Sequence, residues 1–293
     1  MKNYWIVENE KLDPESQRIL NEFLTKKKNS YMSVHTIRGY SYVLQRFIIF
    51  IGKPITKLNS QDILDWINGC SGYKKNTINM MISAISSFIN FCHKKNYIDR
   101  KVCVKSRWRN RLPEPIPRYR EQEELARLRI AAESRSLRDR CLFEFMLSSG
   151  CRVSEVVGLD IKDMDMENRT AVVLGKGKKY RLVHFSERCA ILLEKHIESH
   201  PKNNPALFLN RYGDRLGVKG VEYAMKKISE KAGLEKSLTP HQLRHSFSTG
   251  LANKGADIGF ISIAIGHSRT DTTRIYARVL NEQLAASYKK CMG

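Results

Sequence analysis

The chain has 293 residues, and its 51 lysines and arginines outnumber its 30 aspartates and glutamates, which gives a formal net charge of +21. A chain of this length can bury a substantial core and favours two domains. The charge predicts a polyanionic partner, for which a nucleic acid is the natural candidate. A membrane partner is set aside because no apolar run approaches the length of a bilayer span and no basic amphipathic anchor stands out.

The seven cysteines are scattered, with no CxxC pair and no Cys/His spacing typical of a zinc site. They are expected to be reduced and mostly to fill apolar space. Near the N-terminus, charged residues stand where a signal peptide needs an apolar core. These features predict a cytoplasmic protein, and no metal or other cofactor is expected.

The first hundred residues carry apolar side chains at helical spacing and predict a compact bundle of four helices. Pro14 can open the first helix, Ser33 can cap the second, Gly52 can end it, and Ser60 can cap the third. The helices are expected over residues 13–27, between residues 33 and 52, over 61–68 and over 76–95. The pattern predicts a helical domain spanning residues 1–105.

A basic, proline-containing linker is expected over residues 106–120. The wider stretch 100–120 holds eight basic residues and one acid, Glu114. Three prolines keep its second half extended. Three of its arginines are expected to contact DNA phosphates: Arg107, Arg109 and Arg111.

A second domain is expected over residues 121–293. Helical patterns cover residues 137–148, 186–200 and 219–231, and two β-rich runs flank a Gly-Lys-Gly turn with Lys176 at its tip. The whole chain is therefore predicted to be mainly α with a small antiparallel β-sheet. The basic helix 219–231 is expected to approach a major groove with four side chains: Lys219, Tyr223, Lys226 and Lys227.

The segment TPHQLRHSF sets His241 and Arg244 three residues apart, directly after a proline that can open a helix. An arginine fork matches phosphate oxygens, and an imidazole can move protons near neutral pH, so the pair suits phosphodiester chemistry. By itself, an isolated HxxR in a basic protein favours a capped surface helix with a hydrogen-bonded histidine over a catalytic site. Upstream, Arg152 precedes Glu155 by three residues. Arg152 could serve the same phosphate chemistry, and a surface salt bridge with Glu155 is the alternative interpretation of this spacing.

The ordered set of Arg152, Lys176, HxxRH, Gly-His and a tyrosine nine residues later resembles the tyrosine recombinase family, also called the phage integrase family. The resemblance runs from about Arg118 to the end, and the short chain resembles compact Xer-type members and transposon-borne resolvases. It implies an N-terminal four-helix core-binding domain and a mixed α/β catalytic domain that together clamp duplex DNA.

The resemblance also implies the roles of individual residues. Tyr276 would attack the scissile phosphorus, with Tyr288 as the nearest rival. Arg152, Arg244 and His267 would stabilise charge on the non-bridging oxygens, Lys176 would protonate the leaving oxygen, and His241 would accept the tyrosine proton. Glu155 would brace the cations, and the reaction needs neither metal nor ATP.

The expected function is site-specific recombination of double-stranded DNA by a homotetramer through a Holliday junction and a 3'-phosphotyrosyl intermediate. A type IB topoisomerase and a DNA-binding regulator without catalysis are the alternatives. The target site, the choice among integration, excision and resolution, and any accessory proteins stay open. The 17 residues after Tyr276 predict an amphipathic helix that docks either on its own domain or on a neighbouring protomer.

Overall fold

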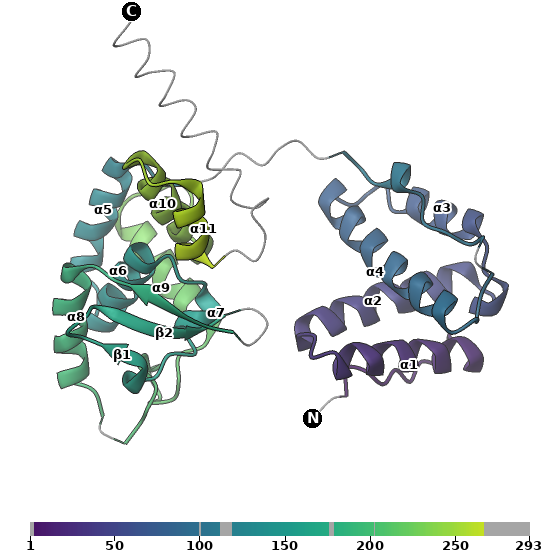
Figure 1. Cartoon of the computed structure of the whole chain (residues 1–293), viewed down its shortest axis with the longest axis horizontal. Helices are drawn as coiled ribbons and strands as arrows, with labels where there is room; N and C mark the ends of the chain where they lie inside the picture. The colour runs from purple at the N-terminus through teal and green to yellow at the C-terminus, as the bar shows by residue number, and fades with distance from the viewer. Residues whose placement is uncertain (1–2, 100, 112–118, 176–178, 202, 267–293) are drawn as a thin grey trace, which may run out of the picture. The chain divides into compact units, whose positions relative to one another are not determined.

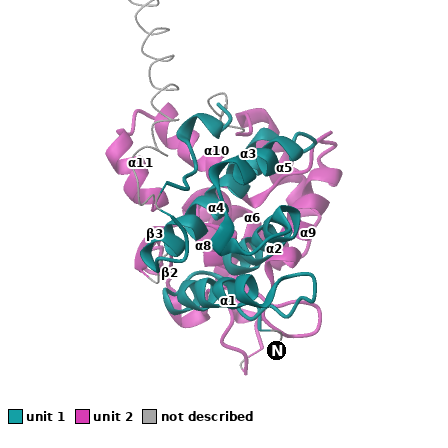
Figure 2. Ribbon diagram, turned by 90° about the vertical axis from the view of Figure 1, so that its right-hand side faces the viewer, with its two compact units in different colours: residues 1–114 teal, residues 115–293 magenta. Residues whose placement is uncertain are grey.

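The computed structural model describes residues 3–99, 101–111, 119–175, 179–201 and 203–266 (Figure 1). The chain divides into two compact units, residues 1–114 and 115–293, which Figure 2 colours separately. The described helices and a small three-stranded antiparallel sheet confirm the predicted mainly α fold. No helix within these described ranges is long and apolar enough to cross a membrane.

The N-terminal unit is built from four α-helices, as predicted. They are α1 (Pro14–Asn29), α2 (Val34–Ile51), α3 (Ser60–Gly69) and α4 (Lys75–Lys94), with short 3₁₀ turns at Ile55–Lys57 and Ser106–Trp108. The Asp13 side chain caps α1, Ser33 caps α2, and Gly52 ends α2 in the left-handed conformation. The predicted Ser60 cap is wrong: Asn59 caps α3, because its side chain and that of Asp62 satisfy each other's backbone N–H.

Aromatic side chains fill the centre of this unit. Phe23 of α1 is fully buried, and its ring lies 5.2 Å from that of Phe88 and 5.4 Å from that of Phe91, both on α4. Trp108, from the segment expected to be a linker, also packs against this core. The beginning of that segment therefore lies on the N-terminal unit.

The second unit surrounds a buried central helix. Its elements are α5 (Gln122–Glu133), α6 (Leu137–Ser149), α7 (Val153–Val156), a 3₁₀ turn (Ile161–Asp163), β1 (Met164–Asp165), β2 (Thr170–Leu174), β3 (Tyr180–His184), α8 (Glu187–Glu198), α9 (Val218–Lys231), α10 (Pro240–Asn253) and α11 (Ile258–Ile265). Helix α6 packs against α5, α8, α9 and α10, so apolar side chains cover most of its circumference.

The sheet has the order β1-β2-β3, and β2 and β3 form the predicted hairpin. Thr170 pairs with His184 and Leu174 with Tyr180, which leaves the tip of the hairpin beyond Gly175. Cys151 and four other cysteines are buried free thiols, whereas the thiol of Cys103 is exposed. The five buried cysteines lie within the two apolar cores, as expected for residues that fill apolar space.

Candidate active site

Helix α10 begins as the TPHQLRHSF segment predicts. Pro240 occupies its first turn, and Thr239 and Gln242 form a capping box, in which each side chain satisfies the other residue's backbone N–H. His241 and His245 then lie one turn apart, with their Nε2 atoms 2.9 Å from each other. The local sequence thus fixes the start of α10, and with it the positions of the two imidazoles and the intervening Arg244 along the helix.

Arg244 joins three elements of the second unit. It is 5% exposed, its Nη1 donates to the Gly150 carbonyl oxygen at 2.7 Å, and its Nη2 donates to that of Ile265. Gly150 ends α6 with φ +62°, and a Cβ there would lie 2.3 Å from the Phe247 ring. A glycine is therefore required for α6 and α10 to approach as closely as they do.

Arg152 and Glu155 form a capping box at the start of α7. The Arg152 backbone N–H donates to Glu155 Oε2 at 2.7 Å, and Arg152 Nη1 donates to Oε1 at 2.9 Å. The predicted ion pair is present, but it is no ordinary surface pair: the Glu155 side chain is 1% exposed and that of Arg152 30%. Arg152 Nη2 also donates to the Gly266 carbonyl oxygen at 2.9 Å.

Arg181 of β3 is a third cation at this place, and the sequence analysis did not identify it. Its Nη2 donates to Glu155 Oε2 at 2.9 Å and its Nη1 to the Ala264 carbonyl oxygen at 2.7 Å. Burial acts to raise the pKa of the Glu155 carboxyl, but hydrogen bonds from Arg181 and Arg152 outweigh it and lower that pKa below its ordinary value. The carboxylate is therefore ionised between two guanidinium groups.

These contacts converge on the C-terminal end of α11. The carbonyl oxygens of three consecutive residues, Ala264, Ile265 and Gly266, each accept a hydrogen bond from a different arginine. We call Arg152, Arg181 and Arg244 the arginine cluster. A helix C-terminus carries partial negative charge, so it stabilises the three cations it gathers.

The cluster also acts on the imidazoles of α10. Burial lowers the pKa of His241, and the positive charges of Arg244 and Arg152 lower it further. Burial, followed by His241 and Arg244, lowers the pKa of His245 to about 4. His241 is therefore neutral near pH 7, and a neutral imidazole can accept a proton.

Three of the expected catalytic residues, Lys176, His267 and Tyr276, lie outside the described residues. Their described neighbours are nonetheless part of the site. Gly175 donates its N–H to the Lys179 carbonyl oxygen at 2.8 Å at the end of the hairpin, and Gly266, the residue before His267, contacts Arg152.

The side chains expected to contact DNA occupy two separate surfaces. On α9, Lys219 and Tyr223 are exposed, and each of the three lysines pairs with an acid of the same helix: Lys219 with Glu222, and Lys226 and Lys227 with Glu230. In the N-terminal unit, Arg107, Arg109 and Arg111 are all exposed, and Arg109 also donates to Ser83 Oγ at 2.9 Å.

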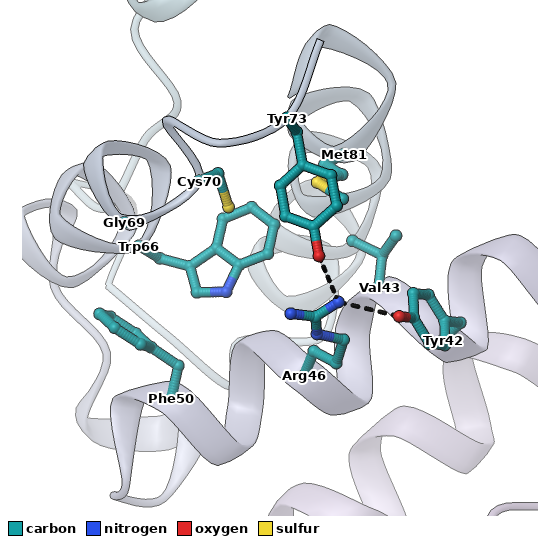
Figure 3. A pocket seen from close by; sticks show the side chains of 9 residues that line it. All are labelled: Tyr42, Val43, Arg46, Phe50, Trp66, Gly69, Cys70, Tyr73 and Met81. Carbon is teal, nitrogen blue, oxygen red and sulfur yellow. Dashed lines mark hydrogen bonds between the residues drawn. The ribbon is translucent and has the colours of Figure 1, made fainter. Parts of the chain in front are cut away.

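The N-terminal unit carries a cavity of about 150 Å³ between α2, α3 and α4 (Figure 3). Arg46 points between two phenols there and donates to the hydroxyl oxygens of Tyr42, at 2.8 Å, and Tyr73, at 2.7 Å. The Cys70 thiol lining it is buried, and burial raises its pKa. Its lining contains neither a histidine nor a carboxylate, unlike the residues around the arginine cluster.

The second unit thus gathers three arginines and a buried carboxylate near a neutral imidazole, an arrangement suited to phosphodiester chemistry. The phage integrase family matches residues 118–283, and the phage integrase N-terminal SAM-like domain matches residues 20–96. The chain therefore belongs to the phage integrase family. It is a tyrosine recombinase, an enzyme of site-specific DNA recombination.

Curated relatives match along almost the whole chain. Tyrosine recombinase XerA of Pyrococcus horikoshii is 31% identical over 278 residues, which cover 93% of each chain. Tyrosine recombinase XerC of Listeria welshimeri is 33% identical over 293 residues, covering 94% of this chain and 96% of the relative. The predicted resemblance is confirmed, and it extends into the N-terminal unit.

Solved structures of recombinases share the fold of this chain. The crystal structure of XerA recombinase is 26% identical, with a TM-score of 0.55 over 95% of this chain and 99% of that one. XerH recombinase bound to a palindromic difH substrate, in a post-cleavage complex, has a TM-score of 0.72 over 96% of this chain and 91% of that one. At 24% identity, the second match shows the fold alone.

Proposed function

We propose that this recombinase cleaves and rejoins duplex DNA through a 3'-phosphotyrosyl intermediate formed on Tyr276. The observation that carries the proposal is the convergence of Arg152, at the start of α7, with His241 and Arg244 of α10. In the proposed division, residues 1–105 form the core-binding domain, 106–120 the linker and 121–293 the catalytic domain.

In the cleavage step, the Tyr276 phenolic oxygen forms a bond to the scissile phosphorus while the bond to the 5'-oxygen breaks. The tyrosine proton passes to His241, and Lys176 protonates the departing 5'-oxygen. Strand rejoining reverses each transfer, with the 5'-hydroxyl as nucleophile and the tyrosine as leaving group. The phosphoryl bond energy is kept in the protein linkage, so ATP is not consumed.

The arginine geometry supports this assignment. A guanidinium has five N–H groups, and two of those of Arg152 have described partners, the Glu155 carboxylate and the Gly266 carbonyl. With a side chain that is 30% exposed, Arg152 can direct its other N–H groups at a phosphate oxygen. Arg244, held at two points, and His267 would add donors that are already in place when charge develops.

DNA binding is proposed to use the linker arginines and the exposed side chains of α9. Arg107, Arg109 and Arg111 would contact the phosphate backbone, while Lys219, Tyr223, Lys226 and Lys227 would reach a major groove. Four protomers are proposed to assemble on two DNA sites and to exchange strands through a Holliday junction in the cytoplasm. Accessory proteins would set the direction of the reaction.

The test begins with a library of randomised DNA duplexes incubated with the full-length protein. Duplexes that stay attached in denaturant are recovered and amplified, and the enriched duplex is placed twice in one plasmid. We expect recombinant products from that plasmid and a tetrameric complex on paired sites. Relaxation of supercoils by a monomer without recombinant products would instead identify a type IB topoisomerase, and binding without any adduct would identify a regulator.

A further inference from the structure

Arg181 connects β3 to the proposed active site. Its guanidinium bridges two partners that are 26 and 83 residues away in the sequence, the Glu155 carboxylate and the Ala264 carbonyl oxygen. Its side chain is 16% exposed, about half the exposure of the Arg152 side chain at 30%. Arg181 is thus placed behind Arg152 rather than at the open side of the cluster.

The Glu155 carboxylate is shared between the two arginines. Oε1 accepts from Arg152 Nη1 at 2.9 Å, and Oε2 accepts from Arg181 Nη2 at 2.9 Å. A carboxylate that is 1% exposed has little water to replace a lost partner. Removing Arg181 would therefore leave one oxygen with only the Arg152 backbone N–H and would free the carboxylate to turn.

Gly266 connects the same two arginines a second time. A Cβ on Gly266 would lie 2.8 Å from Arg181 Cδ, so the end of α11 rests directly on the stem of Arg181. The carbonyl oxygen of Gly266 is also the acceptor of Arg152 Nη2. Both described partners of the Arg152 guanidinium are therefore in contact with Arg181.

We propose that Arg181 is a positioning residue of the recombinase: it holds Glu155 and the C-terminal end of α11, and through these two partners it orients Arg152 toward the scissile phosphate. This inference rests on the proposed function, because it takes Arg152 as a group that stabilises charge on that phosphate. Arg181 itself does not touch DNA in this account.

The first measurement separates cleavage from binding. Wild type, Arg181→Ala, Arg181→Lys and the control Arg169→Ala are compared on a nicked form of the enriched duplex, with saturating protein and a single turnover. Arg169 is the residue directly before β2. Its side chain is half exposed, and its Nη1 lies 3.8 Å from Glu187 Oε2. This control removes a cation next to the sheet and leaves the contacts of the arginine cluster unchanged.

We expect Arg181→Ala to slow formation of the covalent adduct about tenfold to a hundredfold, the loss typical when a partner that orients a functional ligand is removed from a metal site. The dissociation constant of the half-site complex should change less than about twofold, since no phosphate contact is lost. The rate of adduct formation by Arg181→Lys should lie between those of wild type and Arg181→Ala, because an ammonium group lacks the planar fork with which a guanidinium serves two acceptors. Arg169→Ala should match wild type.

A second measurement distinguishes positioning from general loss of structure. Replacing one non-bridging oxygen of the scissile phosphate by a methyl group removes the charge that Arg152 is proposed to stabilise. If Arg181 acts through Arg152, the defect of Arg181→Ala should be about tenfold smaller on this methylphosphonate duplex. A loosened fold would slow both duplexes equally, and that result, or a cleavage rate within twofold of wild type on the normal duplex, would overturn the inference.

The outcomes separate this inference from the function on which it rests. A wild-type protein that forms no adduct with any duplex would overturn the proposed function, and the inference with it. Normal wild-type cleavage with equal defects on both duplexes would overturn the role of Arg181 alone. If Arg181→Ala lacks a cooperative thermal transition, the same two comparisons are made with Arg181→Lys, to which the same criteria apply.

Discussion

His241 and His245 lie one turn apart on α10 with their Nε2 atoms 2.9 Å from each other. At this distance one nitrogen must carry a hydrogen and the other must offer a lone pair, so the pair cannot form when both rings are protonated. The proposed proton acceptor, His241, is thus held by a second imidazole that the folded state keeps neutral.

Acidification should therefore destabilise the protein across a defined range. The pKa of His245 falls from its ordinary value of 6.5 to about 4 on folding, so the unfolded chain takes up a proton first as the pH falls. The free energy of unfolding should decrease from about pH 6.5 to about pH 4. Chemical denaturation across this range should show a shallower pH slope in His245→Gln than in wild type or in His35→Gln, a change at an exposed histidine. Equal slopes in all three proteins would contradict this linkage.

The two arginines of the proposed chemistry should respond differently to truncation. Arg152→Ala leaves Glu155 paired with Arg181, so the protein should stay stable while adduct formation falls about a hundredfold to a thousandfold. Arg244→Ala removes the donors of two carbonyl groups and should also lower the free energy of unfolding by about 1–3 kcal/mol per buried group left unpaired. The free energy of unfolding, from chemical denaturation, and the rate of covalent adduct formation are measured for both variants. A larger loss of stability in Arg152→Ala than in Arg244→Ala would contradict the contacts described.

Several local elements of this site could be predicted from the sequence because their causes are local. A proline, a capping threonine and the HxxR spacing fix the start of α10 and the side chains it presents. The HxxRH run also contained the signal for His245, four residues after His241. By contrast, nothing near Arg181 in the sequence indicates its partners, since they lie 26 and 83 residues away and meet only when β3 packs beside α7 and α11.

The same distinction applies to the N-terminal unit. Hydrophobic periodicity and terminators such as Gly52 predicted its four helices within a few residues of their ends. The predicted Ser60 cap of α3 was one residue late, because the side chains of Asn59 and Asp62 satisfy each other's backbone N–H. How far the basic segment packs on this unit depended on contacts such as Asn79 with Asn110, which periodicity does not reveal.

Gly150→Ala should destabilise the protein by about 1–3 kcal/mol, because the new Cβ would lie 2.3 Å from a Phe247 ring atom and the backbone has φ +62°. Gly213→Ala is the matched control: its φ is +85°, but a Cβ there meets nothing within 4 Å. Chemical denaturation of the two variants separates the steric clash from the backbone cost. Equal losses would show that Phe247 yields and that the close approach of α6 and α10 is not required.

The linker arginines should contribute to affinity without sequence preference. Replacing Arg107 and Arg111 together by alanine should lower the magnitude of the slope of log affinity against log salt by about 2. It should weaken binding to all DNA sequences alike. Arg109→Ala should in addition loosen the segment, because it removes the hydrogen bond to Ser83. Gel shifts over a salt series are the measurement. A loss confined to the enriched duplex would mean that these arginines read bases or DNA shape.

The identity of the DNA-linked residue tests the central claim most directly. Adducts formed on the enriched duplex by wild type, Tyr276→Phe and Tyr288→Phe are digested with protease, and the peptide attached to the 3'-phosphate is identified by mass spectrometry. The account predicts a peptide containing Tyr276 in wild type and in Tyr288→Phe. It also predicts DNA binding without any adduct in Tyr276→Phe, which lacks only the phenolic oxygen. An adduct that survives denaturant in Tyr276→Phe, or a linkage at Tyr288, would contradict it.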